Sequence, residues 1–217
     1  SSEHEVSCVS ASTWLRALQK SPCADKYDVI CVGITKNGRW LACPTLTPDA
    51  MADGSWEKSP DCVPCLLSPD RKDHGLWLLK DGKAELLPLD ICAPVLHGKN
   101  GEDGTIQGLF KLSGIPYVGC GVAASANTMD KALTKMVVEG TGVRQARYYL
   151  ALRYDFERDA EGVVRAAAEQ LGSFPVFVKP CSQGSSVGVA KANNMLELAE
   201  GLTEAFKMDS KVLVEEF

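Results

Sequence analysis

The 217-residue sequence lacks three features that would place it in a class at once. No apolar run approaches the roughly 20 residues of a membrane-spanning helix, and residues 1–5 are polar and acidic where a signal peptide carries a basic segment. Basic side chains are not in excess either, because the sequence has 23 Lys and Arg residues and 28 Asp and Glu residues, which gives a net charge of −5. Non-specific nucleic-acid binding is therefore disfavoured. We expect a cytoplasmic protein whose partners include neither membrane nor nucleic acid.

Cysteine is abundant instead, but the nine cysteines lack the regular spacing of a disulfide framework. Cys62 and Cys65 form a CxxC pair, and no second pair follows to complete a structural zinc site. Several other cysteines lie in apolar runs, where a free thiol behaves as a small buried hydrophobe. We therefore expect reduced thiols, with a redox or zinc role of Cys62 and Cys65 as the alternative.

The first half of the chain combines short apolar runs with turn signals. Residues 27–34 and 91–96 are apolar runs of strand length, suited to buried parallel strands. Asn-Gly at 37–38 and Asp-Gly at 81–82 indicate hairpins. Five prolines among polar residues predict a long surface excursion over residues 44–75. With a helix expected over residues 5–19, this half predicts an open α/β layer.

From residue 105 onward, helical and strand patterns alternate. We therefore expect residues 1–120 to form the open α/β layer and residues 121–217 to form an α+β unit. Expected helices cover residues 105–112, 124–139, 160–171 and 195–206, and expected strands cover residues 115–118, 144–152, 175–179, 187–190 and 212–217.

Three glycine-rich segments could approach a phosphate, and the first fits G-x-G-x-x-A. Gly119, Gly121 and Ala124 carry that pattern, and Glu139 follows Gly119 by 20 residues, as in a dinucleotide-binding fingerprint. However, the preceding strand is the last of its half, and Glu139 falls at a helix end. A turn followed by a helix is the favoured interpretation, and nicotinamide binding is the alternative.

The second segment begins at His97, after an apolar run and before a helix, which is where open α/β sheets bind ligands. Its glycines permit unusual dihedral angles, and its acids and Thr105 can cap the helix. A purely structural loop would explain those residues well. It explains a histidine at the carboxyl end of a strand poorly.

The third segment follows Lys179, which ends one expected strand before a loop rich in Gly and Ser. Lys179 can place a charge on a phosphate while the hydroxyls of Ser185 and Ser186 donate hydrogen bonds. Such a loop can also close over a nucleotide and exclude water. An ordinary hairpin turn would not need so many small polar residues, so a phosphate-covering loop is favoured.

Together and in this order, these segments resemble the D-alanine–D-alanine ligase family of ATP-grasp enzymes. The arm between Glu3 and His97 is similar to the longer-armed branch, which includes the vancomycin-resistance ligases that make D-Ala–D-Ser or D-Ala–D-Lac. The resemblance is carried by residues 1–7 (SSEHEVS), 97–108, 115–119, 124–126 with 129–131, 179–180 with 184–188, and 212–217.

The resemblance implies a fold, a reaction and partners. Residues 1–123 would be a substrate-binding domain with an open parallel, Rossmann-like sheet (the pre-ATP-grasp domain), and residues 124–217 would be the central ATP-grasp subdomain. ATP would phosphorylate one D-alanine, and the amino group of a second would attack the acyl phosphate to give the dipeptide for peptidoglycan. ATP, Mg²⁺ (or Mn²⁺), D-alanine and a homodimer are implied. A non-catalytic nucleotide-binding fragment is the alternative of another class.

The resemblance also assigns residues to the first D-alanine. Glu3 would hold its ammonium, and Ser185 would be linked to Glu3 through hydrogen bonds, so these two are the expected catalytic residues. Val6 would border the substrate methyl group, and His97 would lie near its carboxylate. Without the resemblance, Glu3 could simply favour a helix N-terminus.

The remaining matched residues are assigned to ATP. Taken alone, Lys131 could be a solvated helix lysine and Glu215 an exposed edge-strand residue. In the family pattern, the phosphates are bound by two lysines and the covering loop, and the adenine by the strand that joins the two halves of the grasp. The residues are Lys131, Lys179 and Ser186 for the phosphates, and Glu215, Glu216 and Phe217 for the adenine.

Two departures from the family pattern concern the ends of the chain. Family members begin with a buried strand and a Gly-Gly turn before the Ser-Ser-Glu segment, whereas Ser1 is the first residue here. The matched pattern also stops at Phe217, before the expected transition-state arginine and magnesium ligands. We therefore expect a truncated fold, no metal ligand within the chain, and no catalysis by residues 1–217 alone.

Overall fold

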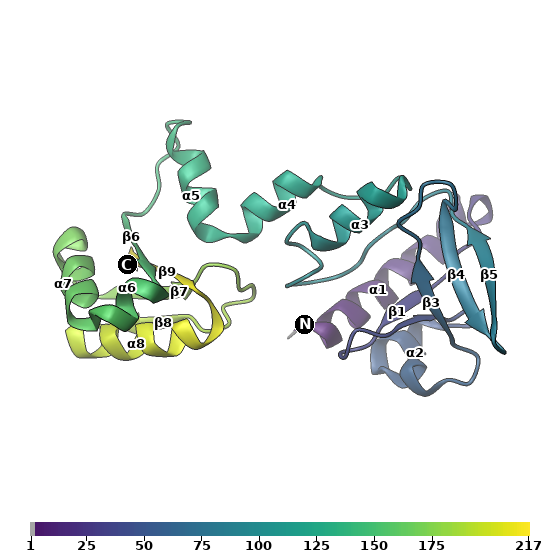
Figure 1. Cartoon of the computed structure of the whole chain (residues 1–217), viewed down its shortest axis with the longest axis horizontal. Helices are drawn as coiled ribbons and strands as arrows, with labels where there is room; N and C mark the ends of the chain where they lie inside the picture. The colour runs from purple at the N-terminus through teal and green to yellow at the C-terminus, as the bar shows by residue number, and fades with distance from the viewer. Residues whose placement is uncertain (1–2) are drawn as a thin grey trace. The chain divides into compact units, whose positions relative to one another are not determined.

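A computed structural model describes residues 3–217, and Figure 1 shows their course. Ser1 and Ser2, which carry part of the family resemblance, lie outside the described residues. The chain forms two compact units, Ser1–Val122 and Ala123–Phe217, and each contains one sheet. The separate roles expected for residues 1–123 and 124–217 remain a prediction.

The first unit combines a long helix, a five-stranded sheet and a second helix after the sheet (Figure 1). Its helices and strands include most of the elements expected from the sequence, together with short helices inside the excursion. They are α1 (His4–Gln19), η1 (Ala24–Lys26), β1 (Val32–Ile34), β2 (Trp40–Ala42), α2 (Pro48–Asp53), η2 (Ser55–Lys58), β3 (Val63–Leu67), β4 (Gly75–Lys80), β5 (Lys83–Pro88) and α3 (Thr105–Ser113).

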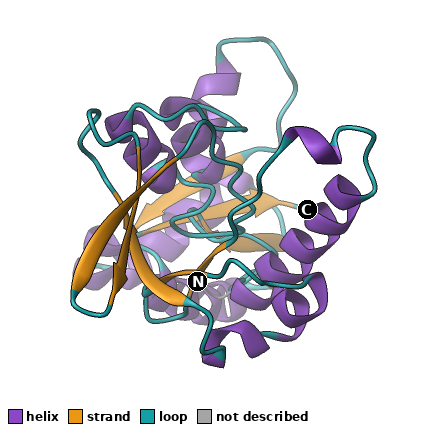
Figure 2. Cartoon of the chain, turned by 90° about the vertical axis from the view of Figure 1, so that its right-hand side faces the viewer, coloured by secondary structure: helices purple, strands orange, loops and turns teal. Residues whose placement is uncertain are grey.

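This sheet is antiparallel in the order β1-β2-β3-β4-β5, so the expected open parallel sheet is wrong for these strands. Strands are drawn in orange in Figure 2. The expected hairpins are confirmed, and they explain the difference. A short turn returns the chain beside the strand it has just left, whereas a parallel pair needs a crossover of a dozen or more residues. The long connection that contains α3 does bring a parallel pair together, since Cys92 forms an isolated parallel bridge with Tyr117. The expected α/β class itself is confirmed.

The apolar run at residues 27–34 is also less buried than expected. β1 covers only Val32–Ile34, and Tyr27 and Val29 are 54% and 38% exposed. In the sheet as described, β1 is an edge strand that pairs with β2 alone. The core of this unit lies instead between β2–β5 and α3, where Leu76, Ile106 and Phe110 are buried.

The expectation that all thiols are reduced is wrong, because Cys43 and Cys62 form a disulfide. The strand register explains the pairing. Ala42 on β2 pairs with Val63 on β3, so the next residues on each side, Cys43 and Cys62, face one another with Cα atoms 4.3 Å apart. Cys65 is a buried free thiol, and burial raises its pKa to about 11. Cys62 and Cys65 therefore do not act as a CxxC pair.

The second unit has a four-stranded antiparallel sheet in the order β6-β9-β7-β8. Helices α7 and α8 pack on it and bury a core that includes Ala167, Leu198 and Val214. The elements are α4 (Val122–Met129), which spans the boundary between the units, α5 (Lys131–Glu139), β6 (Tyr148–Leu152), α6 (Arg153–Arg158), α7 (Ala160–Leu171), β7 (Val176–Pro180), β8 (Ala190–Ala192), α8 (Met195–Met208) and β9 (Lys211–Glu216).

The single long helix expected over residues 124–139 is two helices, because Asp130 interrupts it. Asp130 has an extended backbone, and its Oδ1 accepts hydrogen bonds from the amides of Ala132 and Leu133 at 3.0 and 3.1 Å. Asp130 is thus the N-cap of α5, which points the following residue, Lys131, toward the end of β7. Within residues 3–217, no helix is long and apolar enough to span a bilayer.

Candidate functional site

A buried carboxylate on β9, that of Glu215, is held by two lysines. Glu215 pairs with Phe177 in the register of β7 and β9, and Lys179 lies two residues further along β7, on the same side of the sheet. The Lys179 ammonium forms an ion pair with Oε2 of Glu215. Lys135, from the second turn of α5, places its Nζ 2.6 Å from Oε1 of the same carboxylate. A helix and two strands thus converge on one charged cluster.

The charges of this cluster do not cancel. Glu215 is only 8% exposed, and burial raises the pKa of its carboxyl, but the hydrogen bonds from Lys135 and Lys179 outweigh that effect and bring the pKa below its ordinary value of 4.5. Two ammonium groups against one carboxylate leave one positive charge in surplus. Such a site can attract an anion, because a charge in a poorly solvated place is weakly screened.

An aromatic surface adjoins these lysines at the end of β9. The rings of Phe177 and Phe217 stack with centroids 5.5 Å apart, and Lys191 Nζ lies 4.6 Å from the Phe217 ring centre. Glu216 points to a different partner, since its Oε2 lies 2.7 Å from Nε of Arg147. The structure thus places Phe217 beside an aromatic neighbour and Glu216 in a surface ion pair. Their adenine-binding roles remain predictions.

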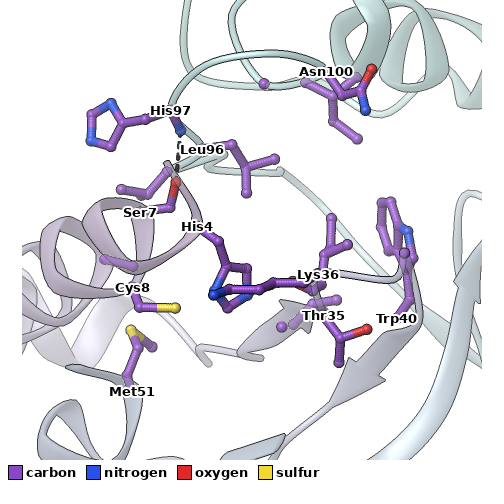
Figure 3. Close-up of a pocket in the computed structure, with 18 of the residues that line it drawn as sticks. His4, Ser7, Cys8, Thr35, Lys36, Trp40, Met51, Leu96, His97 and Asn100 are labelled. Atoms are coloured by element: carbon purple, nitrogen blue, oxygen red, sulfur yellow. Dashed lines mark hydrogen bonds between the residues drawn. The ribbon is translucent and has the colours of Figure 1, made fainter. Parts of the chain in front are cut away.

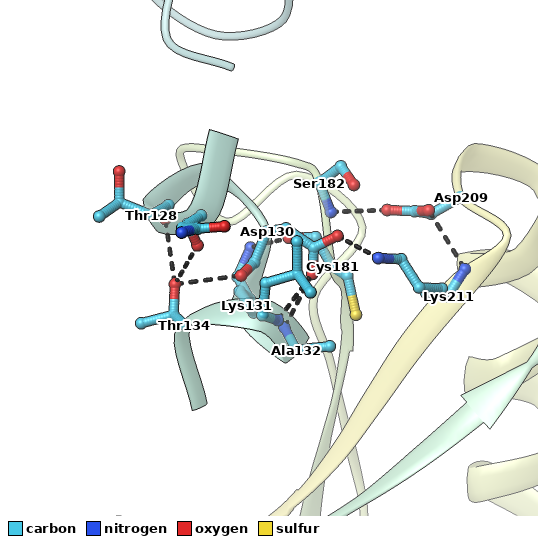
Figure 4. Close-up of polar contacts among 11 residues, drawn as sticks. Thr128, Asp130, Lys131, Ala132, Thr134, Cys181, Ser182, Asp209 and Lys211 are labelled. Carbon is cyan, nitrogen blue, oxygen red and sulfur yellow. Dashed lines mark hydrogen bonds and ion pairs between the residues drawn. The ribbon is translucent and has the colours of Figure 1, made fainter. Parts of the chain in front are cut away.

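The loop between β7 and β8 is a hairpin connection, as expected, and its base is tightly held. Lys131 Nζ donates to the carbonyl oxygens of Pro180, Cys181 and Gln183 at 3.1, 3.5 and 2.5 Å. On the other side, the amide of Ser182 donates to Oδ2 of Asp209 at 2.6 Å (Figure 4). The start of the loop is therefore fixed to the body of the second unit.

Further along, the loop adopts left-handed backbone at Ser185 and Ser186, with φ of 48° and 58°. Its tip is closed by local bonds from the amides of Val187 and Val189 to the carbonyls of Gly184 and Ser186. Two successive serines in this sparsely populated region are uncommon and occur where surrounding structure imposes them. A loop with a fixed base and a tip held by its own backbone suits contact with a ligand.

The alternative interpretation of Lys131 as a solvated helix lysine is wrong. Lys131 is half-buried, and burial lowers its pKa, with the nearby Lys179 adding to that effect. Next to it, Asp130 forms an ion pair with Lys211 of β9 (Figure 4). In this structure Lys131 binds loop carbonyls, and its expected contact with phosphate remains a prediction.

In the first unit, the start of α1 is tied to His97. Glu3 is the N-cap residue and is 8% exposed, but its side chain does not cap the helix. Ser7 Oγ donates to the Glu3 carbonyl oxygen at 3.0 Å and accepts from the His97 amide at 2.9 Å. The His97 ring in turn places Nε2 2.9 Å from Ser10 Oγ. Segments 94 residues apart in sequence thus meet at one place.

Glu102 also lies beside His97, although the sequence suggested only a capping role for this residue. Its Oε2 accepts from the Gly98 amide at 2.6 Å, and its Oε1 lies 3.8 Å from Nδ1 of His97. Glu3, His97 and Glu102 each offer one ligand atom, all within 4.8 Å of one another. Such a group of acceptors suits a cation. Val6, by contrast, is 54% exposed on α1.

A cavity of about 440 Å³ lies beside this group, between α1, β1 and the residues from 95 to 101 (Figure 3). His4 and Ser7 line it from α1, and Trp56 from η2. Its wall is largely apolar, and its charged or titratable lining residues include His4, Lys36, His97 and Lys99. The cavity leaves room for a small molecule next to His97.

The structure thus places the expected site residues in two sets, one in each unit. Glu3, Val6 and His97 belong to the first, and the link expected between Glu3 and Ser185 remains a prediction. Lys135 and Glu102 are the participants that sequence reasoning missed. Lys135 could have been found because it lies one helical turn after Lys131. The second set contains Lys131, Lys179, Ser185, Ser186, Glu215, Glu216 and Phe217.

The dinucleotide fingerprint at Gly119 has no structural support. In the described chain, residues 115–118 contribute only the isolated bridge at Tyr117, and Glu139 is the last residue of α5 rather than the end of a strand. The favoured interpretation, a turn followed by a helix, is confirmed because α4 begins at Val122.

Comparison with known proteins gives consistent matches over the chain. The family model for the D-ala D-ala ligase N-terminus matches residues 1–120, and that for the D-ala D-ala ligase C-terminus matches residues 137–217. The D-alanine–D-alanine ligase of Caldicellulosiruptor bescii is 42% identical over 216 residues, which cover 100% of this chain and 57% of that relative. The vancomycin B-type resistance protein VanB of Enterococcus faecalis is 40% identical with the same coverage.

Solved structures agree with these matches. The VanG D-Ala:D-Ser ligase from Enterococcus faecalis superimposes with a TM-score of 0.87 at 34% identity, over 100% of this chain and 60% of that one. The D-alanine-D-alanine ligase from Coxiella burnetii gives a TM-score of 0.85 at 30% identity, with the same coverage. The chain therefore spans less than two thirds of the length of these relatives. The family expected from the sequence is confirmed: the chain belongs to the D-alanine–D-alanine ligase family.

Proposed function

We propose that this chain is part of an ATP-dependent ligase that joins two D-alanines through an acyl phosphate, for peptidoglycan precursor synthesis. The observation that carries the proposal is the cluster of Lys135, Lys179 and Glu215, which leaves one positive charge in surplus. A reaction that brings a phosphate to a carboxylate must overcome the repulsion of two anions, and fixed cations lower that cost.

Lys179, together with Lys131, would contact the nucleotide phosphates. The Lys179 side chain is 27% exposed, against 11% for Lys135, so it can turn toward a ligand. Ser186 in the loop tip would donate from its hydroxyl, and Phe177 and Phe217 would offer a surface for the adenine ring. Magnesium or manganese would neutralise further phosphate charge. No described residue is assigned to that metal.

The D-alanine part of the proposal rests on the first unit. The acceptor atoms of Glu3, His97 and Glu102 lie close enough to surround one ammonium group, and a carboxylate paired with an ammonium forms a strong charge-assisted hydrogen bond. Glu3 would hold the amino group of D-alanine, and His97 would lie near the substrate carboxylate. We also propose a cytoplasmic homodimer, as in the family that the chain resembles.

A D-Ala–D-Ser or D-Ala–D-Lac ligase is the second candidate, favoured by the match to the VanG D-Ala:D-Ser ligase. Product analysis separates the two. A longer polypeptide that includes residues 1–217 is given ATP, magnesium and D-alanine, alone or with D-serine or D-lactate, and the products are identified by mass spectrometry. Dipeptide from D-alanine alone supports the first candidate. A mixed product formed in preference to it would favour the second.

Binding to the chain itself tests the two sites separately. We expect Lys179→Ala to weaken ATP binding, measured by ligand-observed NMR, while Lys207→Ala, a change at an exposed lysine paired with Glu204, leaves it unchanged. Glu3→Gln should weaken D-alanine binding and leave ATP binding intact. Equal ATP affinity in the two lysine variants, or D-alanine affinity unchanged by Glu3→Gln, would contradict the proposed site concerned.

A further inference from the structure

The two lysines on Glu215 have different surroundings. Lys135 Nζ contacts Glu215 Oε1 at 2.6 Å, donates to the carbonyl oxygen of Ala146 at 3.0 Å, and lies 4.9 Å from the Tyr148 ring centre. Its side chain is 11% exposed. Three protein groups therefore hold the Lys135 ammonium in one place, within the unit and away from solvent.

Lys179 is less enclosed. Its side chain is 27% exposed, and its ammonium contacts Glu215 Oε2 and lies 5.4 Å from the ring centre of Phe177. If Lys179 were the sole partner of Glu215, moving it to a phosphate would leave a buried carboxylate without a counter-charge, which is strongly unfavourable. With Lys135 in place, Glu215 keeps a partner when Lys179 moves.

We propose that Lys135 is a positioning residue of the nucleotide site, which keeps the Glu215 carboxylate paired and in place so that Lys179 is free to bind a phosphate. The inference rests on the proposed function and deepens it. Lys135 does not contact the ligand in this arrangement. It acts through Glu215, by supplying the second positive charge that makes the Lys179 charge available.

The charge count of this cluster predicts an unusual pattern of variants. Lys135→Met leaves one lysine and one carboxylate, so Lys179 stays paired with Glu215 and the surplus charge is lost. Adding Glu215→Gln to Lys135→Met removes the competing carboxylate and restores the surplus on Lys179. Adding Glu215→Gln to Lys179→Met leaves the surplus on the enclosed Lys135 instead, where it should not serve a phosphate.

Inorganic tripolyphosphate is the probe, because it carries the phosphate charge without the adenine. We expect the unmodified chain to bind it and ATP, and Lys135→Met to weaken both by roughly tenfold, the loss of one charge-assisted contact. The double variant Lys135→Met/Glu215→Gln should regain the tripolyphosphate affinity, and Lys179→Met/Glu215→Gln should not. Lys207→Met is the control and should bind as the unmodified chain does.

The recovery in the double variant distinguishes this role from simple damage to the fold, because a second substitution in the same core would not repair misfolding. Should Lys135→Met fail to fold, Glu215→Gln alone serves, since freeing Lys179 should tighten tripolyphosphate binding. Three results would overturn the inference alone. They are an unchanged tripolyphosphate affinity in Lys135→Met, no recovery of that affinity in Lys135→Met/Glu215→Gln, and no gain of affinity in Glu215→Gln. Absence of ATP and tripolyphosphate binding by the unmodified chain would overturn the proposed nucleotide site as well.

Discussion

Lys131 Nζ lies 2.5 Å from the carbonyl oxygen of Gln183, and this contact joins the first residue of α5 to the loop between β7 and β8. The same ammonium also donates to Pro180 O at 3.1 Å. A half-buried cation that bonds to main-chain oxygens stabilises the position of the loop base without occupying the loop tip. The tip, with Ser185 and Ser186, remains available to a ligand.

We therefore expect Lys131→Met to loosen the loop base. Without the ammonium, the carbonyls of Pro180 and Gln183 lose a shared donor, and the amides of residues 182–188 should exchange with deuterium faster. The measurement is hydrogen–deuterium exchange by mass spectrometry on the free chain. Lys207→Met provides the control, because Lys207 lies on the exposed face of α8. Exchange in the loop that matches the control would show that Lys131 does not hold it.

Reduction of the disulfide between Cys43 and Cys62 should destabilise the first unit. The bond closes a loop with a sequence separation of 19, and a loop of this size contributes about 3 kcal/mol by restricting the unfolded chain. Urea unfolding followed by Trp fluorescence, with and without reductant, measures the difference. In Cys43→Ala/Cys62→Ala, reductant should have no effect. A reductant effect of equal size in that variant would assign it to another part of the chain.

Gly33→Ala should also destabilise the first unit. A Cβ at Gly33 would lie 2.2 Å from the ring of Trp56, which is 3% exposed and cannot move into free space. Overpacking of this kind costs about 1–3 kcal/mol. Gly108→Ala is the matched control, since a Cβ there meets nothing within 4 Å and Gly108 lies in helix α3, where Ala is favoured by up to about 1 kcal/mol. We expect Gly33→Ala to lower the midpoint temperature of thermal unfolding and Gly108→Ala to raise it. An unchanged midpoint in Gly33→Ala would contradict the close packing.

The Glu215 carboxyl should make the second unit less stable in acid. Its pKa is below the ordinary 4.5 in the folded chain, since the lysine hydrogen bonds outweigh the burial that raises it. Below about pH 4.5 the unfolded chain binds a proton at this site that the folded chain does not, so stability is lost as the pH falls through the folded pKa. Unfolding free energies measured between about pH 3 and about pH 7 should depend less steeply on pH in Glu215→Gln than in the unmodified chain. An identical slope would exclude this contribution.

Local patterns in the sequence predicted many of the elements. The helical periodicity of residues 5–19 and 195–206 and the turn residues at 37–38 and 81–82 correspond to α1, α8 and two hairpins. Helix period and turn chemistry depend on neighbours in the chain, so they can be derived without the fold. The prediction of one long helix over residues 124–139 was wrong. Asp130 caps α5 through its side chain, and the spacing of apolar residues carries no information about such a cap.

Charged contacts between distant segments could not be derived in the same way. The disulfide follows from the register of β2 and β3, and Glu102 meets Glu3 only because the loop after His97 returns to α1. Lys135 belongs to the cluster on Glu215 because α5 packs on β9. Each of these pairings depends on strand register or helix packing, which is set by the whole unit.

By itself, the sequence determined the family and the α/β class, and it predicted residues to bind a phosphate and an amino acid. These depend on residue types in a fixed order, and the order is legible without coordinates. Only the tertiary structure decided that the first sheet is antiparallel, that Cys43 is bonded to Cys62, and that Lys131 holds a loop while Lys135 and Lys179 share one carboxylate. Such facts depend on distances of a few ångströms between segments far apart in sequence, and packing alone sets those distances.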